Sequence, residues 1–403
     1  MIKISFLGDI MCEGPFLRAA DTGQGGYDFS GAFDGLKDFL SESDYVIGNL
    51  ETPAAGQSHE YTRETDLYSF NTPAAFIREV KNAGVDLALT ANNHCFDRGE
   101  EGLLATLEAL DACGLAHTGT YPEKGEKVFT KTIEDITFSI ISCTSSTNAE
   151  MTGEKASLKN VNLLNRQRGK EQKTNRNPMT AGKQFIINDV IGLRRYMKIR
   201  KMLGKSPLNP TSDDSFLHSE ADRYIDRIIR MIESSAKGSD YVFVCPHMGG
   251  QFNVKPGKFS EYVMEKFSLT NVDGVIASHP HILQKIQVNN GKQCFYSIGN
   301  VSMSLNTEYI IRENRPDLGL IVNAYLEKGK PARYTCTIIK EMEDENGFIR
   351  AYLLNDLIRD ASGEEKEQLI RDYRQAVKLL QIQCDTVGKH LSEGNAFPAE
   401  IAI

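Results

Sequence analysis

Short apolar runs alternate with amphipathic segments along the first 145 residues. The runs are bounded by polar residues, as buried strands are, and the segments between them repeat apolar residues at helical spacing. Strands are predicted at 2–9, 44–51 and 85–92, and helices at 29–43, 71–84 and 99–114. Thr72 as N-cap, Pro73 as first helical residue and Gly84 after the last turn bound the second helix. Strands and helices that alternate across short connections predict an α/β sandwich with a largely internal sheet.

The alternation returns in the second half of the chain. The pattern predicts a strand pair at 128–143, strands at 241–247 and 272–281, and helices at 215–238 and 259–271. Asn290-Gly291 between two short runs predicts a hairpin over 285–300. Further strands follow from residue 318, and a polar helix is predicted at 363–383 as a cap on the core.

Composition narrows the class of protein. The chain of 403 residues is 40% apolar and 25% charged, with a net charge of −8 and a pI near 5.6, so the protein as a whole is not built to coat nucleic acid. No apolar run approaches the roughly 20 residues of a membrane span, and the N-terminus lacks the pattern of a signal peptide. We therefore expect a cytoplasmic protein, membrane-associated only if an anchor precedes this sequence. Eight cysteines without a CxxC pair do not indicate a zinc ribbon.

A basic insertion, defined as residues 151–210, interrupts the alternation. It holds 14 Lys and Arg against 3 Asp and Glu, a net charge of +11, which leaves −19 on the rest of the chain. Two interpretations stay open. The insertion is either a solvated surface segment or a basic lid that attracts an anionic substrate by long-range steering.

Polar side chains stand where five of the predicted strands end. They are Asp9, then Asn49 and Glu51, then Asn93 and His94, then His247, and finally His279 and His281 around Pro280. The residue before a proline favours extended geometry, so we expect the two imidazoles of this last pair in a stiff, extended turn. Binding sites of open α/β sheets form at the carboxyl ends of strands. Mixed imidazole, carboxylate and amide ligands suit manganese, iron or zinc.

The order of these motifs, GD, NLE, ANNHxxDxG, H, HPH and YSxGN, resembles the CapA-type capsule-synthesis family, also called the poly-γ-glutamate synthesis (PgsA-like) family. That family is similar in fold to the calcineurin-like metallophosphoesterases. The resemblance covers roughly 2–300 apart from the basic insertion. It implies a four-layer α/β/β/α sandwich with two mixed sheets flanked by helices. Residues 1–310 would form this domain, and 311–403 would complete it with strands and a capping helix.

The resemblance also implies roles for single residues. One or two divalent ions (Mn, Fe or Zn) would be bound by Asp9, Glu51, Asn93, His247, His279 and His281. His94 would be the catalytic acid, oriented by Asp97. Substrate would be contacted by Asn49, Asn92, Arg98, Gln251 and Asn300.

Three positions depart from the general superfamily pattern. Met11 stands where a histidine ligand is usual, so the first metal site lacks a donor. Glu51 replaces the bridging aspartate. Gln251 stands near His247 where the family tends to carry a glutamate, and its amide cannot act as a base.

Three functions remain open at this point. The first is a metal-dependent hydrolase, a phosphoesterase linked to the synthesis of a capsule or another surface polymer, acting on an anionic small molecule or polymer. The second is a non-catalytic component that binds an anionic polymer or other capsule-synthesis proteins. A nucleic-acid phosphodiesterase is disfavoured, because Tyr196 is the only aromatic residue in the most basic part of the insertion.

Overall fold

The structure is a computed structural model that describes residues 1–63, 66, 69–122, 125, 127–149, 159–167, 195, 199, 202, 216–307, 310–382 and 400–403. Most of the basic insertion therefore lies outside the described residues, and both interpretations of it stay predictions.

The first sheet is mixed and contains the N-terminal strand near its middle. Its order is β14-β13-β12-β1-β2-β3-β4, with β11 beside β1 and β15 beside β13. The parallel strands are β1 (Ile2–Ile10), β2 (Tyr45–Leu50), β3 (Leu87–Leu89), β4 (Ala116–Thr118) and β11 (Asn300–Ser302). The antiparallel strands are β12 (Leu318–Leu326), β13 (Arg333–Glu343), β14 (Ile349–Leu353) and β15 (Ile401–Ala402). Strands from beyond residue 310 thus continue the sheet of β1, which supports the proposal that the C-terminal part completes the same domain.

The second sheet has the order β5-β6-β7-β8-β10-β9. Its strands are β5 (Phe129–Ile133), β6 (Ile136–Thr144), β7 (Tyr241–His247), β8 (Gly274–Ile276), β9 (Ile286–Asn289) and β10 (Lys292–Phe295). The predicted hairpin is confirmed, because Asn290 and Gly291 both have positive φ between β9 and β10.

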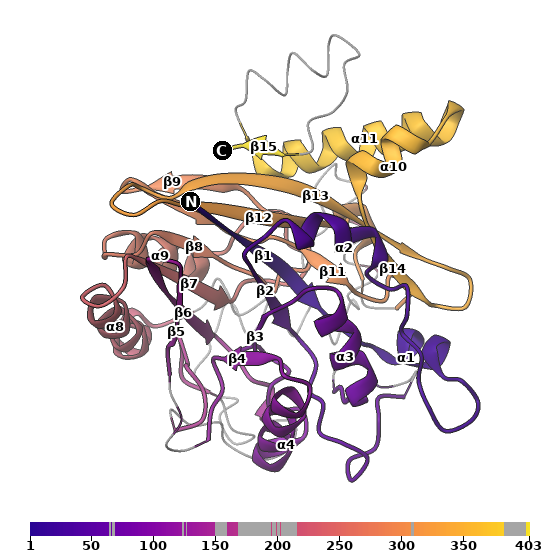
Figure 1. Ribbon diagram of the computed structural model, residues 1–403, viewed down its shortest axis with the longest axis horizontal. Helices are drawn as coiled ribbons and strands as arrows, with labels where there is room; N and C mark the ends of the chain where they lie inside the picture. Colours follow the sequence, from indigo (N-terminus) through magenta and orange to yellow (C-terminus); the bar gives the residue numbers. More distant parts are fainter. Residues whose placement is uncertain are drawn as a thin grey trace.

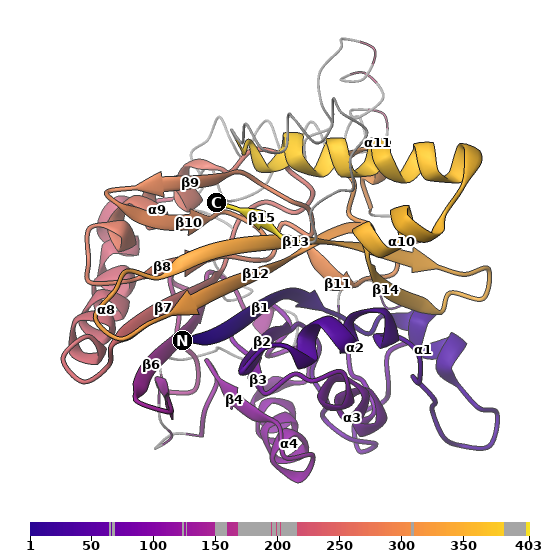
Figure 2. The same cartoon turned by 45° about the horizontal axis from the view of Figure 1, so that its top comes forward.

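The two sheets face each other across an apolar core. Alternate residues of β1, among them Ile4 and Phe6, meet Phe138 and Phe243 of the second sheet, and the rings of Phe6 and Phe243 lie 5.3 Å apart. Helices cover the outer faces (Figures 1 and 2). On the first sheet these are α1 (Gly14–Ala20), α2 (Asp34–Ser41), α3 (Ala74–Asn82) and α4 (Gly99–Ala112); on the second they are α8 (His218–Ser235) and α9 (Lys258–Ser268). The predicted four-layer sandwich is confirmed.

The C-terminal helices pack against the apolar core between the two sheets. α10 (Leu354–Asp360) and α11 (Gly363–Leu380) follow β14, and Leu369, Tyr373 and Leu380 of α11 join the apolar core between the sheets. Asp372 of α11 lies 2.9 Å from the Lys340 ammonium on β13. A short 3-10 turn, η3 (Arg312–Asn314), precedes β12.

Several elements differ from the sequence-based expectation. The strands expected at 85–92 and 272–281 are shorter, Leu87–Leu89 and Gly274–Ile276. The helix expected at 29–43 begins only at Asp34, because Gly31 has a φ of +84°, which a right-handed helix cannot accommodate. The second helix is capped by Pro73 and not by Thr72. Helix α1 was not predicted, although Pro15 in its first turn is a typical start signal.

Glycine brings β1 and β11 unusually close together. A Cβ on Gly8 would lie 2.0 Å from the carbonyl oxygen of Gly299, and the Asp9 amide donates to that same oxygen at 3.0 Å. Asp9 is consequently paired with Asn300 across the two strands. The glycines of the GD and YSxGN motifs therefore bring Asp9 and Asn300 to the same end of the sheet.

Candidate metal centre

The polar ends of strands from both sheets meet at one place. Asp9 is near the end of β1 and Glu51 directly follows β2, while His247 ends β7 and the two histidines around Pro280 follow β8. All are buried, with at most 9% of the residue surface exposed. Their potential ligand atoms form two groups within 4.8 Å: Glu51, His247 and His279, and Asp9, Glu51 and His281.

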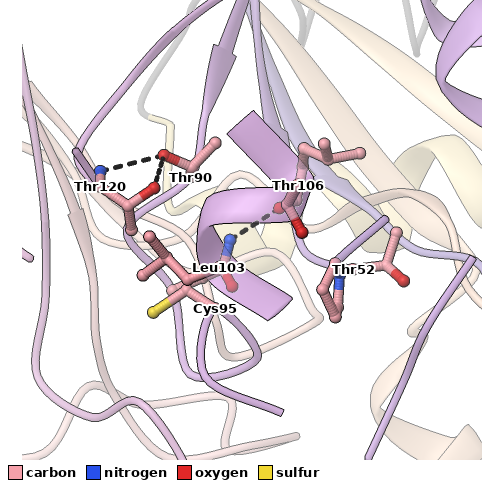
Figure 3. Close-up of a pocket in the computed structure, with 9 residues that line it drawn as sticks. Thr52, Thr90, Cys95, Leu103, Thr106 and Thr120 are labelled. Atoms are coloured by element: carbon pink, nitrogen blue, oxygen red, sulfur yellow. Dashed lines mark hydrogen bonds between the residues drawn. The ribbon is translucent and has the colours of Figure 1, made fainter. Parts of the chain in front are cut away.

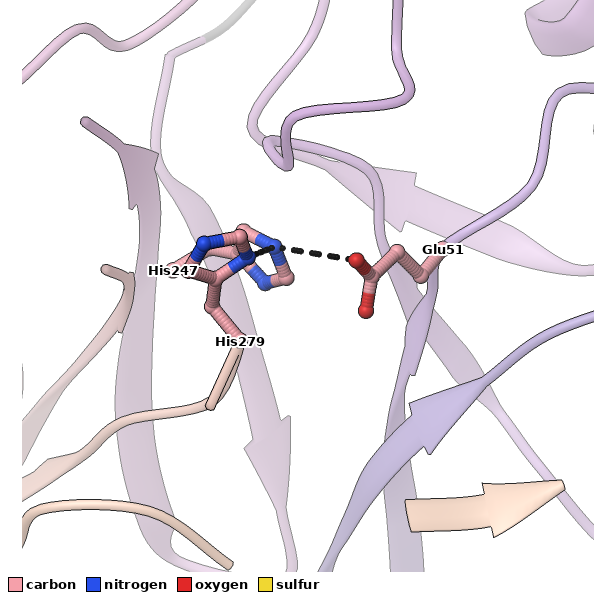
Figure 4. Close-up of side chains that lie close together, drawn as sticks. All are labelled: Glu51, His247 and His279. Atoms are coloured by element: carbon pink, nitrogen blue, oxygen red, sulfur yellow. Dashed lines mark hydrogen bonds and ion pairs between the residues drawn. The ribbon is translucent and has the colours of Figure 1, made fainter. Parts of the chain in front are cut away.

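Glu51 belongs to both groups. Its Oε1 lies 3.3 Å from Nε2 of His247 and 3.6 Å from Nε2 of His281. Figure 4 shows its carboxylate pointing at the imidazoles of His247 and His279. Asn93 joins on the same side, since its Oδ1 lies 2.6 Å from Nε2 of His247. All six residues predicted as metal ligands are therefore brought together.

Unsatisfied polar atoms show that the centre fits a cation. Among the described residues, neither oxygen of Glu51 nor Nε2 of His281 has a hydrogen-bond partner, although all three atoms are buried. An isolated buried acceptor is costly, and a metal ion satisfies several at once. Two carboxylates, an amide oxygen and three imidazoles are the ligand mixture that manganese, iron and zinc accept.

Burial and neighbouring charges displace the pKa values of this cluster. Burial alone would raise the pKa of Asp9, but the hydrogen bond of its carboxylate with His281, together with that from Asn49, holds it well below its usual value. Burial and the charge of Asp9 raise the pKa of Glu51 well above its usual range. Burial, then repulsion from His279, lowers the pKa of His247 well below normal. Burial, then repulsion from His281, lowers the pKa of His279 to about 3. Neutral imidazoles keep lone pairs available for a cation, which would also favour ionised Glu51.

The turn that carries the two histidines is not extended as expected. His279 has a φ of +102° and His281 a φ of +57°. The pre-proline preference is overridden by tertiary hydrogen bonds: the His279 amide donates to Oδ2 of Asp9 at 3.1 Å, and the Pro280 carbonyl accepts from the Phe252 amide at 2.8 Å. Positive φ at residues other than glycine is costly and is typical of functional sites.

Asn300, expected to contact substrate, lies behind His281. Its Nδ2 donates to the carbonyl groups of His281 and Pro316 at 3.0 and 2.9 Å, so its Oδ1 faces Nδ1 of His281 at 3.0 Å. An amide oxygen can only accept, so Nδ1 of His281 carries the proton and the lone pair is left on Nε2, beside Glu51. Asn300 is completely buried, which favours a supporting role over substrate contact.

Asn49 and Asn92 are also satisfied inside the protein. Asn49 donates to Oδ1 of Asp9 at 2.7 Å and lies 3.2 Å from Nδ1 of His247. Asn92 donates to the main chain of β2 at 2.7 Å and accepts from the His94 amide at 3.1 Å. Both are buried, so their placement also favours support of the ligands over substrate contact.

His94 and Asp97 form a buried pair at the edge of the centre. Nδ1 of His94 lies 2.6 Å from Oδ2 of Asp97, and Nε2 of His94 points toward Glu51, 3.9 Å from its Oε1. Asp97 also accepts from the Phe70 amide at 2.7 Å and from Asn148 at 3.4 Å. This is the geometry of a histidine held at one nitrogen with the other facing the reaction site.

The two remaining residues predicted to contact substrate, Arg98 and Gln251, and the unusual Met11 are not members of the two ligand groups. Arg98 donates to the Ser69 hydroxyl and to main-chain carbonyls, so it holds the loop before α3. Gln251 is half-buried in the loop after β7. Met11 packs in an apolar cluster with Phe70, and so provides hydrophobic packing where the general superfamily has a ligand.

Sequence reasoning missed Ser278, Asn148 and Phe70. The Ser278 hydroxyl lies 3.0 Å from Nδ1 of His247, and only its place directly before His279 could have pointed to it. Asn148 has a φ of +54°, a conformation that asparagine tolerates, but the loop it belongs to carries no motif. Phe70 is one apolar residue among many and gave no signal.

A small cavity lies under the loop that carries Asn92. Its volume is ≈ 10 Å³, room for one water molecule, and it is lined by Leu50, Thr52, Pro53, Thr90, Asn92, Cys95, Leu103, Thr106 and Thr120. Figure 3 shows the hydroxyl of Thr90 accepting from both the amide and hydroxyl of Thr120. The cavity is too small for a substrate and belongs to the support of the loop.

The chain matches a known protein family over most of its length. The pattern of the family described as "Bacterial capsule synthesis protein PGA_cap" matches residues 3–304. The chain belongs to this family. The family is part of the metallophosphoesterase-like superfamily, as the resemblance implied.

Two named relatives are similar over most of the chain. "PGA biosynthesis protein CapA" of Bacillus subtilis (strain 168) is 23% identical over 305 residues, 74% of this chain and 63% of that protein. "Capsule biosynthesis protein CapA" of Bacillus anthracis is 22% identical over 349 residues, 84% of this chain and 71% of that protein. The chain thus spans only 63% of the length of the Bacillus subtilis relative. Within the described residues, the structure contains no helix with the length and apolar character of a membrane span.

Proposed function

We propose that the chain is a metal-dependent phosphoesterase that acts in the metabolism of a capsule or another surface polymer. The observation that carries the proposal is the position of Glu51. Its carboxylate has no hydrogen-bond partner in the described structure, belongs to both ligand groups, and lies 3.9 Å from Nε2 of His94. A ligand shared by two groups beside a held histidine suits hydrolysis of a phosphoester.

One or two ions would be held by the six residues of the centre. Asp9, Glu51 and His281 would hold the first, and Glu51, Asn93, His247 and His279 the second. Bound ions would supply Lewis-acid activation of a phosphoryl group and of water at neutral pH. Manganese, iron and zinc are the candidates, because the donors are mixed nitrogen and oxygen atoms.

Among the side chains of this protein, His94 would donate the proton in the reaction. Asp97 accepts from Nδ1 of His94 and so fixes which nitrogen faces Glu51. With Nδ1 held in this way, Nε2 of the protonated imidazole can donate its proton to the departing oxygen of a phosphoester. Burial of the pair limits competition from water.

The names of the relatives suggest the biological setting. They refer to PGA and capsule biosynthesis, and we propose that this chain acts on an anionic precursor or polymer of that class. Capsule-synthesis proteins are its candidate partners. Action inside the cell remains a prediction from the sequence.

The test is hydrolysis by protein stripped of metal and reloaded with manganese, iron or zinc. We expect activity on p-nitrophenyl or bis-p-nitrophenyl phosphate, and a loss of about 10²-fold or more in His94→Asn when the ester is the less activated phenyl phosphate. His117→Asn is the matched control, because His117 pairs with Asp111 at 3.2 Å outside the metal centre. A chain that takes up no metal and hydrolyses none of these esters would overturn the proposal.

The second candidate is a non-catalytic polymer-binding component. It is favoured by the net charge of +11 in the basic insertion and by Met11 in place of a ligand. Salt-sensitive binding of poly-γ-glutamate by a metal-free, inactive chain would support it. Binding that persists after the insertion's Lys and Arg are neutralised would exclude it.

A further inference from the structure

We infer that Phe70 is a positioning residue for His94. The inference rests on the proposed role of His94 as a proton donor. The Phe70 ring lies with its centroid 4.3 Å from that of the His94 imidazole, at 32° between the planes. Phe70 is 1% exposed and His94 4%, so this contact is enclosed within the protein.

The main chain of Phe70 contacts the other member of the pair. The Phe70 amide donates to Oδ2 of Asp97 at 2.7 Å, and Nδ1 of His94 lies 2.6 Å from the same oxygen. One residue thus touches the imidazole with its ring and the orienting carboxylate with its backbone. A hydrogen bond at Nδ1 fixes one point of the imidazole, but the ring can still turn about that bond. An aromatic ring packed against the imidazole, tilted by 32° to it, restricts that rotation.

The loop that carries Phe70 is firmly held. The neighbouring Asn71 is completely buried, and its amide group donates to three main-chain carbonyls of the loop after β2, those of Gly56, His59 and Glu60. The Ser69 hydroxyl donates to the Asp97 carbonyl at 3.3 Å. Phe70 cannot leave His94 without breaking bonds on both sides of it.

An apolar cluster packs with Phe70. It consists of Met11, Phe70, Phe252, Ile282, Met303 and Ile311, all 3% exposed or less. Met11, at the position where the general superfamily has a histidine ligand, therefore contributes here to the cluster that contains the Phe70 ring. The Phe70 ring would keep the His94 plane in place while Asp97 sets its nitrogen, so that Nε2 stays directed at Glu51.

The contact can be tested without any activity. In protein labelled with ¹³C and ¹⁵N at histidine, the His94 ring protons, assigned with His94→Asn, should be displaced by the ring current of Phe70. Phe70→Leu should abolish the displacement and Phe70→Tyr should keep it. Phe76→Leu is the control, because Phe76 is fully buried in α3 among Phe16 and Phe29. Wild-type His94 signals without a ring-current displacement would overturn the inference, whether or not the variants fold.

Kinetics separates a positioning role from general packing. If Phe70 aims the proton donor, Phe70→Leu should lower kcat for phenyl phosphate about 10-fold more than kcat for p-nitrophenyl phosphate, whose leaving group needs little protonation. Phe70→Tyr should restore the wild-type ratio, and Phe76→Leu should not change it. Equal losses on both esters would overturn the positioning role. A chain that takes up no metal and hydrolyses neither these esters nor bis-p-nitrophenyl phosphate refutes the proposed phosphoesterase, and with it the role of Phe70 in proton donation. The ring-current measurement then still decides whether Phe70 fixes the His94 plane.

Discussion

Nε2 of His281 and Oε1 of Glu51 face each other at 3.6 Å, and within the described residues neither atom has a hydrogen-bond partner. Asn300 holds the proton of His281 on the opposite nitrogen, so the lone pair on Nε2 of His281 points at the buried carboxyl group of Glu51. Such an arrangement is unfavourable without a cation or a proton between them. A cation bound at the candidate centre would relieve this arrangement directly, because it would contact both atoms.

Glu51→Gln should remove metal from the centre, because both ligand groups share this carboxylate. We expect metal affinity to fall by at least about 100-fold, the upper end of the loss caused by removing only a supporting residue. The measurement is metal content per chain after dialysis against a chelator. Glu79→Gln is the control, since buried Glu79 pairs with Lys37 on the helical side of the first sheet. A variant with the full metal content of the wild type would contradict this assignment of Glu51.

Asn300→Ala should weaken metal binding without removing a ligand. Without the amide oxygen, His281 is free to carry its proton on Nε2, where the metal would bind. The expected loss is about 10- to 100-fold in affinity, measured by competition with a chromogenic chelator. Asn289→Ala serves as the comparison, because Asn289 is also buried but binds Tyr296 in the hairpin. Equal affinities in both variants would refute the supporting role.

Gly8→Ala should be severely destabilising. The added Cβ would lie 2.0 Å from the Gly299 carbonyl oxygen, which belongs to the backbone and cannot move aside alone. We expect a loss of about 4 kcal/mol or more in the free energy of unfolding, or failure to fold. Gly238→Ala, where an added Cβ has no neighbour within 4 Å in the described part of the chain, should be nearly neutral in the same urea titration. A Gly8→Ala protein as stable as wild type would show that the two strands are further apart than described.

Glu341→Gln should raise stability at neutral pH. Burial, then the negative charge of Asp317, raises the pKa of Glu341 well above its usual value. The folded protein therefore binds a proton that the unfolded chain releases. The stability gained from binding this proton is complete below the pKa of about 4.3 in the unfolded chain. It is lost as the pH rises toward the pKa of Glu341 in the folded protein. Glutamine is neutral and can still accept from the Met303 amide, which donates to Oε2 at 3.2 Å.

The check on Glu341 is the free energy of unfolding between pH 5 and 8. The wild type should lose stability relative to Glu341→Gln by about 1.4 kcal/mol for each pH unit between the unfolded and folded pKa values. Glu343→Gln is a weaker comparison, because Glu343 is less buried. A constant difference across this range would contradict ionisation of Glu341 as its source.

The sequence pattern located the candidate ligand residues but not the residues that support them. Asp9 and Glu51 lie at the carboxyl ends of adjacent parallel strands of the first sheet, so the pattern places them at one edge. His247 ends β7 of the second sheet, and its approach to them depends on how the two sheets pack. Which side chain holds which ligand depends on contacts between distant residues. The contact of Asn49 with His247 spans 198 positions, and no local pattern encodes it.

Local rules failed where tertiary contacts are strong. The pre-proline rule predicted an extended backbone at His279. The His279 amide instead donates to Asp9, 270 residues away, and His279 adopts a positive φ. The helix expected from Phe29 onward was shortened by Gly31, whose conformation the apolar spacing did not reveal. Phe70 could not be foreseen, because a ring contact with His94 leaves no trace in periodicity.

The pairing of the first strand dictates when the centre can come into being during protein synthesis. Ile2 of β1 pairs with Leu326 of β12, so one edge of β1 pairs with a strand that is made more than 300 residues later. The imidazoles of the centre emerge only with residues 247–281. On the ribosome, this edge of the apolar strand must therefore stay unpaired until β12 has been made, a state prone to wrong association. The full set of candidate ligands exists only once His281 has been made, so we expect an ion to be bound long after β1 has been synthesised.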